Sequence, residues 1–262
     1  SLCPGAICCC AQNPWPKRRL ALARSRAGYN AVRAMPDSPN QGWRPMYIPS
    51  SFCEKRVDEM HRLIRAHPLG LLVTHGREGL QASPVPFVIY SEEGQHGVLR
   101  AHLAKANPHG KELAECSECL VAFQGMEGYI TPSWYPTKSI NGKVVPTWNY
   151  ATVHAWGKPE VVADDGWLRR QIDDLTRLHE GRRPLPWSTD DAPVDYLAAQ
   201  RQALIGIEIV ISRIEGKWKM SQNRNDADRV GVIDGLRAED DPHRHPLLAD
   251  LVESRSRRQA DA

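Results

Sequence analysis

The segment 102–108 combines residue types that bind anions at the start of a helix. It carries His102, Lys105 and Asn107 at the end of an expected strand, and Pro108 suits the first position of the helix that follows. Free amides and the helix dipole attract phosphate at such a start, and the lysine adds a positive charge. The competing interpretation is a capped helix that binds nothing, beside a lysine in solvent.

A second segment, 130–150, is rich in aromatic and hydroxyl side chains. It contains Trp134, Thr147, Trp148 and Asn149, together with two lysines. Aromatic surface beside polar donors suits a planar heteroaromatic ligand with an anionic tail. A purely structural aromatic cluster, for example at a dimer interface, would have the same composition.

The third segment, 219–224, places several hydrogen-bonding residues in succession after the last expected strand. Gln222 could bind the edge of a ring, and Arg224 could hold a phosphate through two hydrogen bonds. The alternative is a cap for the next helix, which is expected to begin at Asn225 or Asp226.

Other motifs give weaker signals. The sequence contains no GxGxxG, GxxxxGK[ST], HExxH or GxSxG pattern, which removes the main signal for dinucleotide-binding, P-loop and hydrolase functions. Cys116 and Cys119 form a lone CxxC without a second pair, so we expect small buried residues rather than a zinc or redox site. His243 and His245 lie in a charged connection. No metal site is predicted, and no catalytic residue is assigned.

The hydrophobic spacing predicts a helix first and then many short strands. A capping box from Ser51 to Glu54 predicts the first helix, which ends at Pro68. Strands are expected at 69–75, 80–90, 98–104, 119–124, 128–131, 147–162 and 205–211, and helices near 108 and at 164–179, 194–204, 225–236 and 247–258. Residues 132–146 are expected to form a loop. This order predicts a mainly β, α+β fold: a small closed or split β-barrel with peripheral and C-terminal helices.

Charge divides the chain into two parts. Residues 1–45 hold seven Lys or Arg and one acid, Asp37, which gives them a net charge of +6. The whole chain has a net charge of +3, so residues 46–262 carry −3. We interpret 1–45 as a disordered or non-native extension before a start at Met46, with an organelle transit peptide as the alternative. The barrel is predicted for 46–222 and a helical segment for 223–262. The acidic body argues against direct binding to the DNA backbone.

The composition indicates a globular protein of a reducing compartment. Hydrophobic residues make up 41% and charged residues 25% of the sequence, which is ordinary for a folded domain. No apolar run approaches the roughly 20 residues that a membrane-spanning helix needs. Only three of the seven cysteines lie beyond residue 10, so we expect no disulfide scaffold and favour the cytoplasm.

Four blocks of the sequence resemble one family. They are HLAKANP at 102–108, YITPSWYPTK at 129–138, GKVVPTWNYATVHAWG at 142–157 and KMSQNRNDADRVGVIDGL at 219–236. These blocks are similar to those of PaiB-type proteins, an FMN-binding split-barrel family described as negative regulators of protease synthesis and sporulation. The resemblance runs from Met46 to about Leu251. One departure is that family members often carry a histidine in a T-H-L-P-F pattern, where this chain has Ala82 to Phe87 without one.

The resemblance implies a split-barrel homodimer with FMN at the interface between the subunits. A small barrel fills its own interior with side chains, so a flat ligand is better placed in a cleft between two barrels. The residues assigned to FMN by their position are His102, Lys105 and Asn107 near the phosphate, Trp134, Thr147, Trp148 and Asn149 near the ring or ribityl chain, and Gln222 and Arg224 at the closure of the site.

Three functions remain open from the sequence. The family description implies a negative transcriptional regulator, with DNA as a partner despite the unfavourable charge. Other split-barrel members imply a flavin-dependent oxidoreductase with an unknown small-molecule substrate. A haem protein is the third alternative, with His154 or the pair His243 and His245 as candidate ligands.

Overall fold

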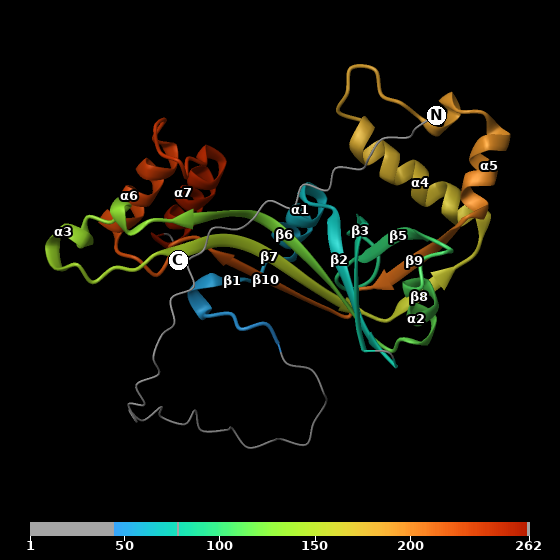
Figure 1. The fold of residues 1–262 in the computed structure, drawn as a ribbon, viewed down its shortest axis with the longest axis horizontal. Helices are drawn as coiled ribbons and strands as arrows, with labels where there is room; N and C mark the ends of the chain where they lie inside the picture. The colour runs from blue at the N-terminus through green and yellow to red at the C-terminus, as the bar shows by residue number, and fades with distance from the viewer. Residues whose placement is uncertain (1–44, 78, 261–262) are drawn as a thin grey trace, which may run out of the picture. The chain divides into compact units, whose positions relative to one another are not determined.

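Two antiparallel sheets form the framework of the protein in the computed structural model (Figure 1). The structure describes residues 45–77 and 79–260, with the side chains of 257–260 left aside, so the predicted extension 1–45 lies almost entirely outside the described residues. Sheet A has the strand order β1-β10-β7-β6-β2-β3 and sheet B the order β4-β5-β9-β8. The strands are β1 (Cys53–Glu54), β2 (Leu69–Gly76), β3 (Gly79–Pro86), β4 (Val88–Tyr90), β5 (Val98–Ala104), β6 (Cys119–Ile130), β7 (Thr147–Gly157), β8 (Pro159–Val162), β9 (Leu204–Val210) and β10 (Arg213–Lys219).

Helices pack at the ends and edges of the sheets. The α-helices are α1 (Val57–Ala66), α2 (His109–Glu115), α3 (Thr137–Asn141), α4 (Asp165–Glu180), α5 (Val194–Gln202), α6 (Asp226–Arg237) and α7 (Pro246–Ala260), and the 3-10 helices are η1 (Ser50–Phe52), η2 (Pro132–Trp134) and η3 (Thr189–Asp191). Figure 1 shows α4 and α5 beside sheet B, and α3, α6 and α7 at the other end of the long strands β6 and β7. None of the helices in the described ranges has the length and apolar character that crossing a bilayer requires. The predicted α+β barrel with peripheral and C-terminal helices is confirmed.

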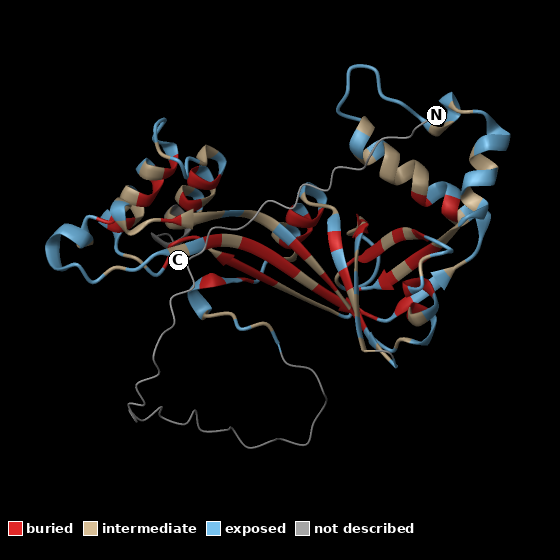
Figure 2. Ribbon diagram, in the orientation of Figure 1, coloured by how far each residue is buried: buried red, intermediate tan, exposed pale blue. Residues whose placement is uncertain are grey.

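The core lies between the inner faces of the two sheets. Alternate residues are buried along β2 and along the first part of β6, as period-two strands require, and Leu72, Phe123 and Ile207 have no exposed surface. Phe87 packs edge-to-face against Phe123, with ring centroids 5.9 Å apart. Figure 2 shows the buried residues concentrated along the strands, whereas α3 and α5 are mostly exposed.

The outer side of β2 and β3 is apolar and exposed. Leu69, Leu71 and Leu80 keep 63%, 43% and 78% of their surface accessible. The register pairs Leu71 with Pro84 and Leu69 with Pro86, so these side chains lie on one face of the sheet. We call Leu69, Leu71 and Leu80 the outer leucine face. Neighbouring exposed apolar side chains on one sheet face are typical of a surface that a partner covers.

Several predictions about the elements were wrong. The strand expected at 80–90 is divided between β3 of sheet A and β4 of sheet B, the loop expected at 132–146 contains η2 and α3, and β10 was not predicted. The segment from Ser51 to Glu54 does not cap a helix, because Glu54 lies in β1 and α1 begins only at Val57. The single strand expected at 147–162 is two strands that belong to different sheets, β7 and β8. The break comes at Gly157, where an added Cβ would lie 2.3 Å from the carbonyl oxygen of Val210. Only glycine permits this close approach of β7 to the end of β9.

Candidate functional site

The three residues predicted near a phosphate lie at the end of β5 and the start of α2. The Nδ1 of His102 donates to Oε1 of Gln171 over 2.6 Å. Lys105 is exposed, and its Nζ donates to the backbone oxygen of Gln202 at 2.6 Å. Asn107 accepts a hydrogen bond from the amide of His109, 3.0 Å away. Lys105 is therefore a cation at the surface, held by a single carbonyl.

His109 fixes this end of the molecule to sheet A. Its ring is completely buried, with one nitrogen 2.9 Å from the hydroxyl of Thr74 and the other 2.9 Å from that of Ser83. Thr74 lies in β2 and Ser83 in β3, so the histidine connects the first turn of α2 to both strands. Because two hydroxyls occupy both nitrogens, we assign His109 a structural role.

Lowering the pH is expected to destabilise the protein through His109. Burial lowers the pKa of His109 below its ordinary 6.5, although Glu112 opposes the shift. The unfolded chain therefore binds more protons below about pH 6.5, and the free energy of unfolding falls there. The variant His109→Asn has no titratable group at this position. Its free energy of unfolding should therefore decrease less between about pH 8 and about pH 5.5, as measured by urea denaturation. The exposed His179→Asn is the control, and an unchanged pH dependence in His109→Asn would contradict the assignment.

The aromatic segment lies where β6 ends and β7 begins. Trp148 is 52% exposed, and its ring meets that of Tyr129 edge-on with centroids 6.0 Å apart. Lys219 donates both to the hydroxyl of Thr147 and to the carbonyl of Trp148. The ring of His243 also packs against Tyr129, with centroids 4.8 Å apart. The result is an accessible aromatic surface with a lysine beside it.

Asn149 and Gln222 are buried behind this surface. The Nδ2 of Asn149 donates to the hydroxyl of Ser221 over 3.0 Å. Gln222 accepts from the amide of Met220 and donates to the carbonyl of Trp218, each over 2.6 Å. The side-chain amides thus bond within the chain in this structure, and their contact with a ligand stays a prediction.

Ser221 has an unusual backbone conformation. Its φ of 62° is the only positive value at a described residue other than glycine, and its side chain is buried against Asn149. Such a conformation is costly and persists only where the surroundings enforce it. The strained turn therefore fixes the direction in which the chain leaves β10.

Trp134 and Arg224 lie around the same end of the sheet. The indole of Trp134 donates to Asp241 over 2.9 Å and packs against Gly235 of α6, where an added Cβ would approach the ring to 2.4 Å. The guanidinium of Arg224 lies 4.6 Å from the centre of the Tyr135 ring. Trp134 is thus partly used in docking α6.

The nine predicted residues form two groups within one chain. His102, Lys105 and Asn107 belong to the β5–α2 end, which we call the lysine end. The other group, at the β6–β7–β10 end, is called the aromatic end and consists of Trp134, Thr147, Trp148, Asn149, Gln222 and Arg224. Figure 1 shows these two ends on opposite sides of the described chain. A single chain therefore does not bring all nine residues into one cavity.

Cys119 and His154 have ordinary structural surroundings. Burial raises the pKa of the Cys119 thiol to about 12, and its sulfur lies 3.3 Å from the carbonyl oxygen of Gly157. Burial lowers the pKa of His154, whose ring meets that of Trp156. Within residues 45–77 and 79–260, no group of three or more His, Cys, Asp or Glu is arranged to hold a metal ion.

Sequence reasoning missed three residues beside the candidate groups. Tyr129 begins the block 129–138, and its position beside Trp148 follows from the β6–β7 register, which no local pattern reveals. Gln171 had no signal beyond its place in an amphipathic helix. Lys219 had a signal in the sequence, because it is the first residue of the third segment.

A family model and several relatives match most of the part of the chain that the structure describes. Residues 46–213 match the family model described as "Putative FMN-binding domain". An uncharacterized protein of Emericella nidulans is 38% identical over 226 residues, covering 73% of this chain and 90% of that protein. Protease synthase and sporulation protein PAI 2 of Bacillus subtilis is 29% identical over 214 residues, covering 82% of this chain and 100% of the relative.

Solved structures with low sequence identity also align with the chain. The conserved hypothetical protein Rv2991 of Mycobacterium tuberculosis has a TM-score of 0.49 at 12% identity, covering 68% of this chain and 93% of that one. The FAD and heme binding protein from Mycobacterium smegmatis has a TM-score of 0.48 at 17% identity, covering 64% and 73%. The family match and the fungal relative decide membership: the chain belongs to the family described as "Putative FMN-binding domain" and is related to PAI 2.

Proposed function

We propose that the protein binds FMN between two copies of the chain, with the lysine end of one subunit facing the aromatic end of its partner. The observation that carries this proposal is the separation of the two candidate groups within one chain. The outer leucine face offers an apolar surface through which a second copy could pack. A dimer built on this face would bury apolar surface and could complete the site in the same step.

The side chains fit the two chemically different parts of FMN. The exposed ammonium of Lys105 suits a phosphate, because only one hydrogen bond, to the carbonyl oxygen of Gln202, holds it within the chain. The exposed ring of Trp148 suits the isoalloxazine by stacking. Arg224 lies at the aromatic end as a second cation. When bound, FMN would supply redox chemistry, while these residues would hold and orient it.

Removing the Lys105 charge is expected to weaken FMN binding. A charge-assisted hydrogen bond to phosphate contributes about 1.5–3 kcal/mol, so Lys105→Ala should raise the dissociation constant roughly 10- to 100-fold. The measurement is the quenching of FMN fluorescence on titration with protein. Lys111→Ala, an exposed lysine of α2, is the matched control and should leave the affinity unchanged. Equal affinities for Lys105→Ala and the natural protein would contradict the assignment.

We propose a cytoplasmic negative regulator of transcription as the context of FMN binding, as the PaiB resemblance implies. The relationship to PAI 2, whose name refers to protease synthesis and sporulation, supports this context. A gel-shift assay at physiological salt, with and without FMN, tests direct action on DNA. No salt-sensitive DNA binding, together with reduction of the bound flavin by a nicotinamide donor, would favour the alternative of a flavin-dependent oxidoreductase.

A further inference from the structure

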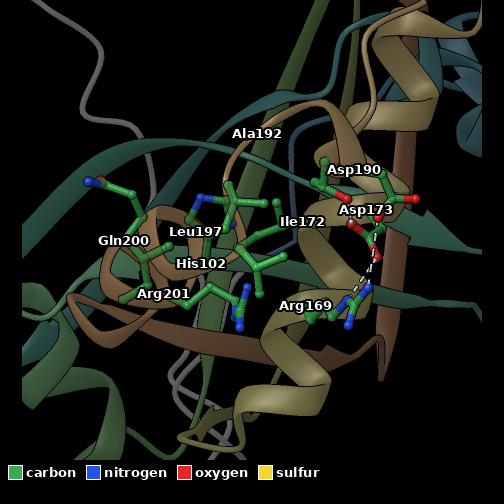
Figure 3. Close-up of a pocket in the computed structure, with 12 residues that line it drawn as sticks. His102, Arg169, Ile172, Asp173, Asp190, Ala192, Leu197, Gln200 and Arg201 are labelled. Carbon is green, nitrogen blue, oxygen red and sulfur yellow. Dashed lines mark hydrogen bonds and ion pairs between the residues drawn. The ribbon is translucent and has the colours of Figure 1, made fainter.

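A cavity of about 300 Å³ lies between α4, α5 and the β5–β9 pair of sheet B. Figure 3 shows side chains of α4 and α5 facing one another across it. Its apolar walls include Ile172 of α4, Leu197 of α5 and Leu204 of β9, which are only half-buried because the cavity leaves them uncovered. This volume is at the lower end of the range typical of small-molecule sites, roughly 300–1,000 Å³.

His102 lines this cavity. Its Nδ1 is bonded to Gln171, which is only 1% exposed, while its Nε2 has no hydrogen-bond partner among the described residues. The Nε2 of Gln171 is buried without a partner. A buried unpartnered donor is unfavourable for stability. We therefore assign Gln171 the role of orienting the imidazole of His102 rather than that of stabilising the fold.

The charges around the cavity favour an acidic ligand. Arg201 lines the cavity with only 16% of its side chain exposed, and it pairs through Nε and Nη2 with Asp165. Its Nη1 has no hydrogen-bond partner among the described residues. The lining acids are already paired, because Asp173 and Asp190 lie 3.9 and 4.0 Å from Arg169. Asp173 also accepts from the hydroxyl of Thr189.

We propose that this cavity binds a small molecule with an apolar body and one carboxylate. The body would cover Ile172, Leu197 and Leu204, and the carboxylate would accept hydrogen bonds from His102 and Arg201. The site is separate from the proposed flavin stacking surface at Trp148, although His102 adjoins both the cavity and the lysine end. It does not depend on FMN binding.

Calorimetric titration with octanoate and octan-1-ol tests the charge requirement. The natural protein is expected to bind one octanoate per chain at least about tenfold more tightly than octan-1-ol, the difference expected of a charge-assisted hydrogen bond. Arg201→Gln should abolish that preference. Absence of octanoate binding at millimolar concentration, or an unchanged preference in Arg201→Gln, would overturn the proposal.

Filling the cavity tests the location. Leu197→Trp and Ala192→Trp each place an indole in the cavity from a different segment and should abolish octanoate binding while leaving FMN binding unchanged. The control is Leu185→Trp, at a residue that is 87% exposed. Ala192→Trp retains the test if Leu197→Trp fails to fold. Octanoate binding that survives in both folded variants would show that the cavity is not its site. A failure of FMN titration alone would contradict only the proposed function.

Discussion

Replacing Leu71 and Leu80 with aspartate is expected to yield a monomer whose FMN affinity falls roughly 100-fold or more, because burying an unpaired carboxylate at an interface is strongly unfavourable. Both side chains lie on the outer leucine face, where nothing within the described chain covers them. Aspartate would remain solvated in a single chain, so the fold should survive. Loss of the partner would leave each lysine end without an aromatic end opposite it.

Sedimentation velocity and FMN titration on the same samples measure the two effects. The matched control is Leu185→Asp combined with Val194→Asp, at leucine and valine side chains that are 87% and 83% exposed but far from β2 and β3 in the sequence. The control should remain dimeric and bind FMN normally. A monomeric Leu71→Asp/Leu80→Asp variant with full FMN affinity would show that one chain suffices for the site.

Local signals in the sequence predicted the elements well wherever neighbouring residues determine them. The strand expected at 98–104 has the bounds of β5. Asp164 caps α4, its side chain accepting from the amide of Trp167 over 2.6 Å. The strand depends on the alternation of apolar and polar residues, and the cap depends on residues within four positions of each other. Both signals can be seen directly in the sequence.

Distant contacts explain what the sequence could not predict. The residue pattern around Ser51 matches a capping box, yet the carboxylate of Glu54 accepts a hydrogen bond from Arg255, 201 positions later. The nine candidate residues were assigned to one FMN site between subunits, and how they divide within a single chain was not predicted: β5 belongs to sheet B and β7 to sheet A. Sheet membership and register depend on pairing between segments far apart in the chain, so spacing alone could not separate the two ends.

The contact between Glu54 and Arg255 is expected to be a major determinant of stability. Glu54 has 4% and Arg255 11% of the side chain exposed, and Arg255 also stacks on Trp218 with 4.9 Å to the ring centre. Removing one partner of a buried pair leaves the other without compensation and typically costs about 3–5 kcal/mol. We therefore expect Glu54→Gln to lower the free energy of unfolding by about 3 kcal/mol or more. It should also loosen the packing of α7 against β1.

The pH dependence of the free energy of unfolding distinguishes the loss of this ion pair from a loss of packing. Burial alone would raise the pKa of Glu54, but hydrogen bonds from Arg56 and Arg255 outweigh it and lower the pKa from 4.5 to about 2. The stabilisation is therefore complete above about pH 4.5 and is lost as the pH falls toward about 2. In urea denaturation, the difference between the natural protein and Glu54→Gln should shrink from about pH 7 to about pH 3. The exposed Glu239→Gln is the control, and a difference that stays constant with pH would indicate that packing, not charge, holds α7 in place.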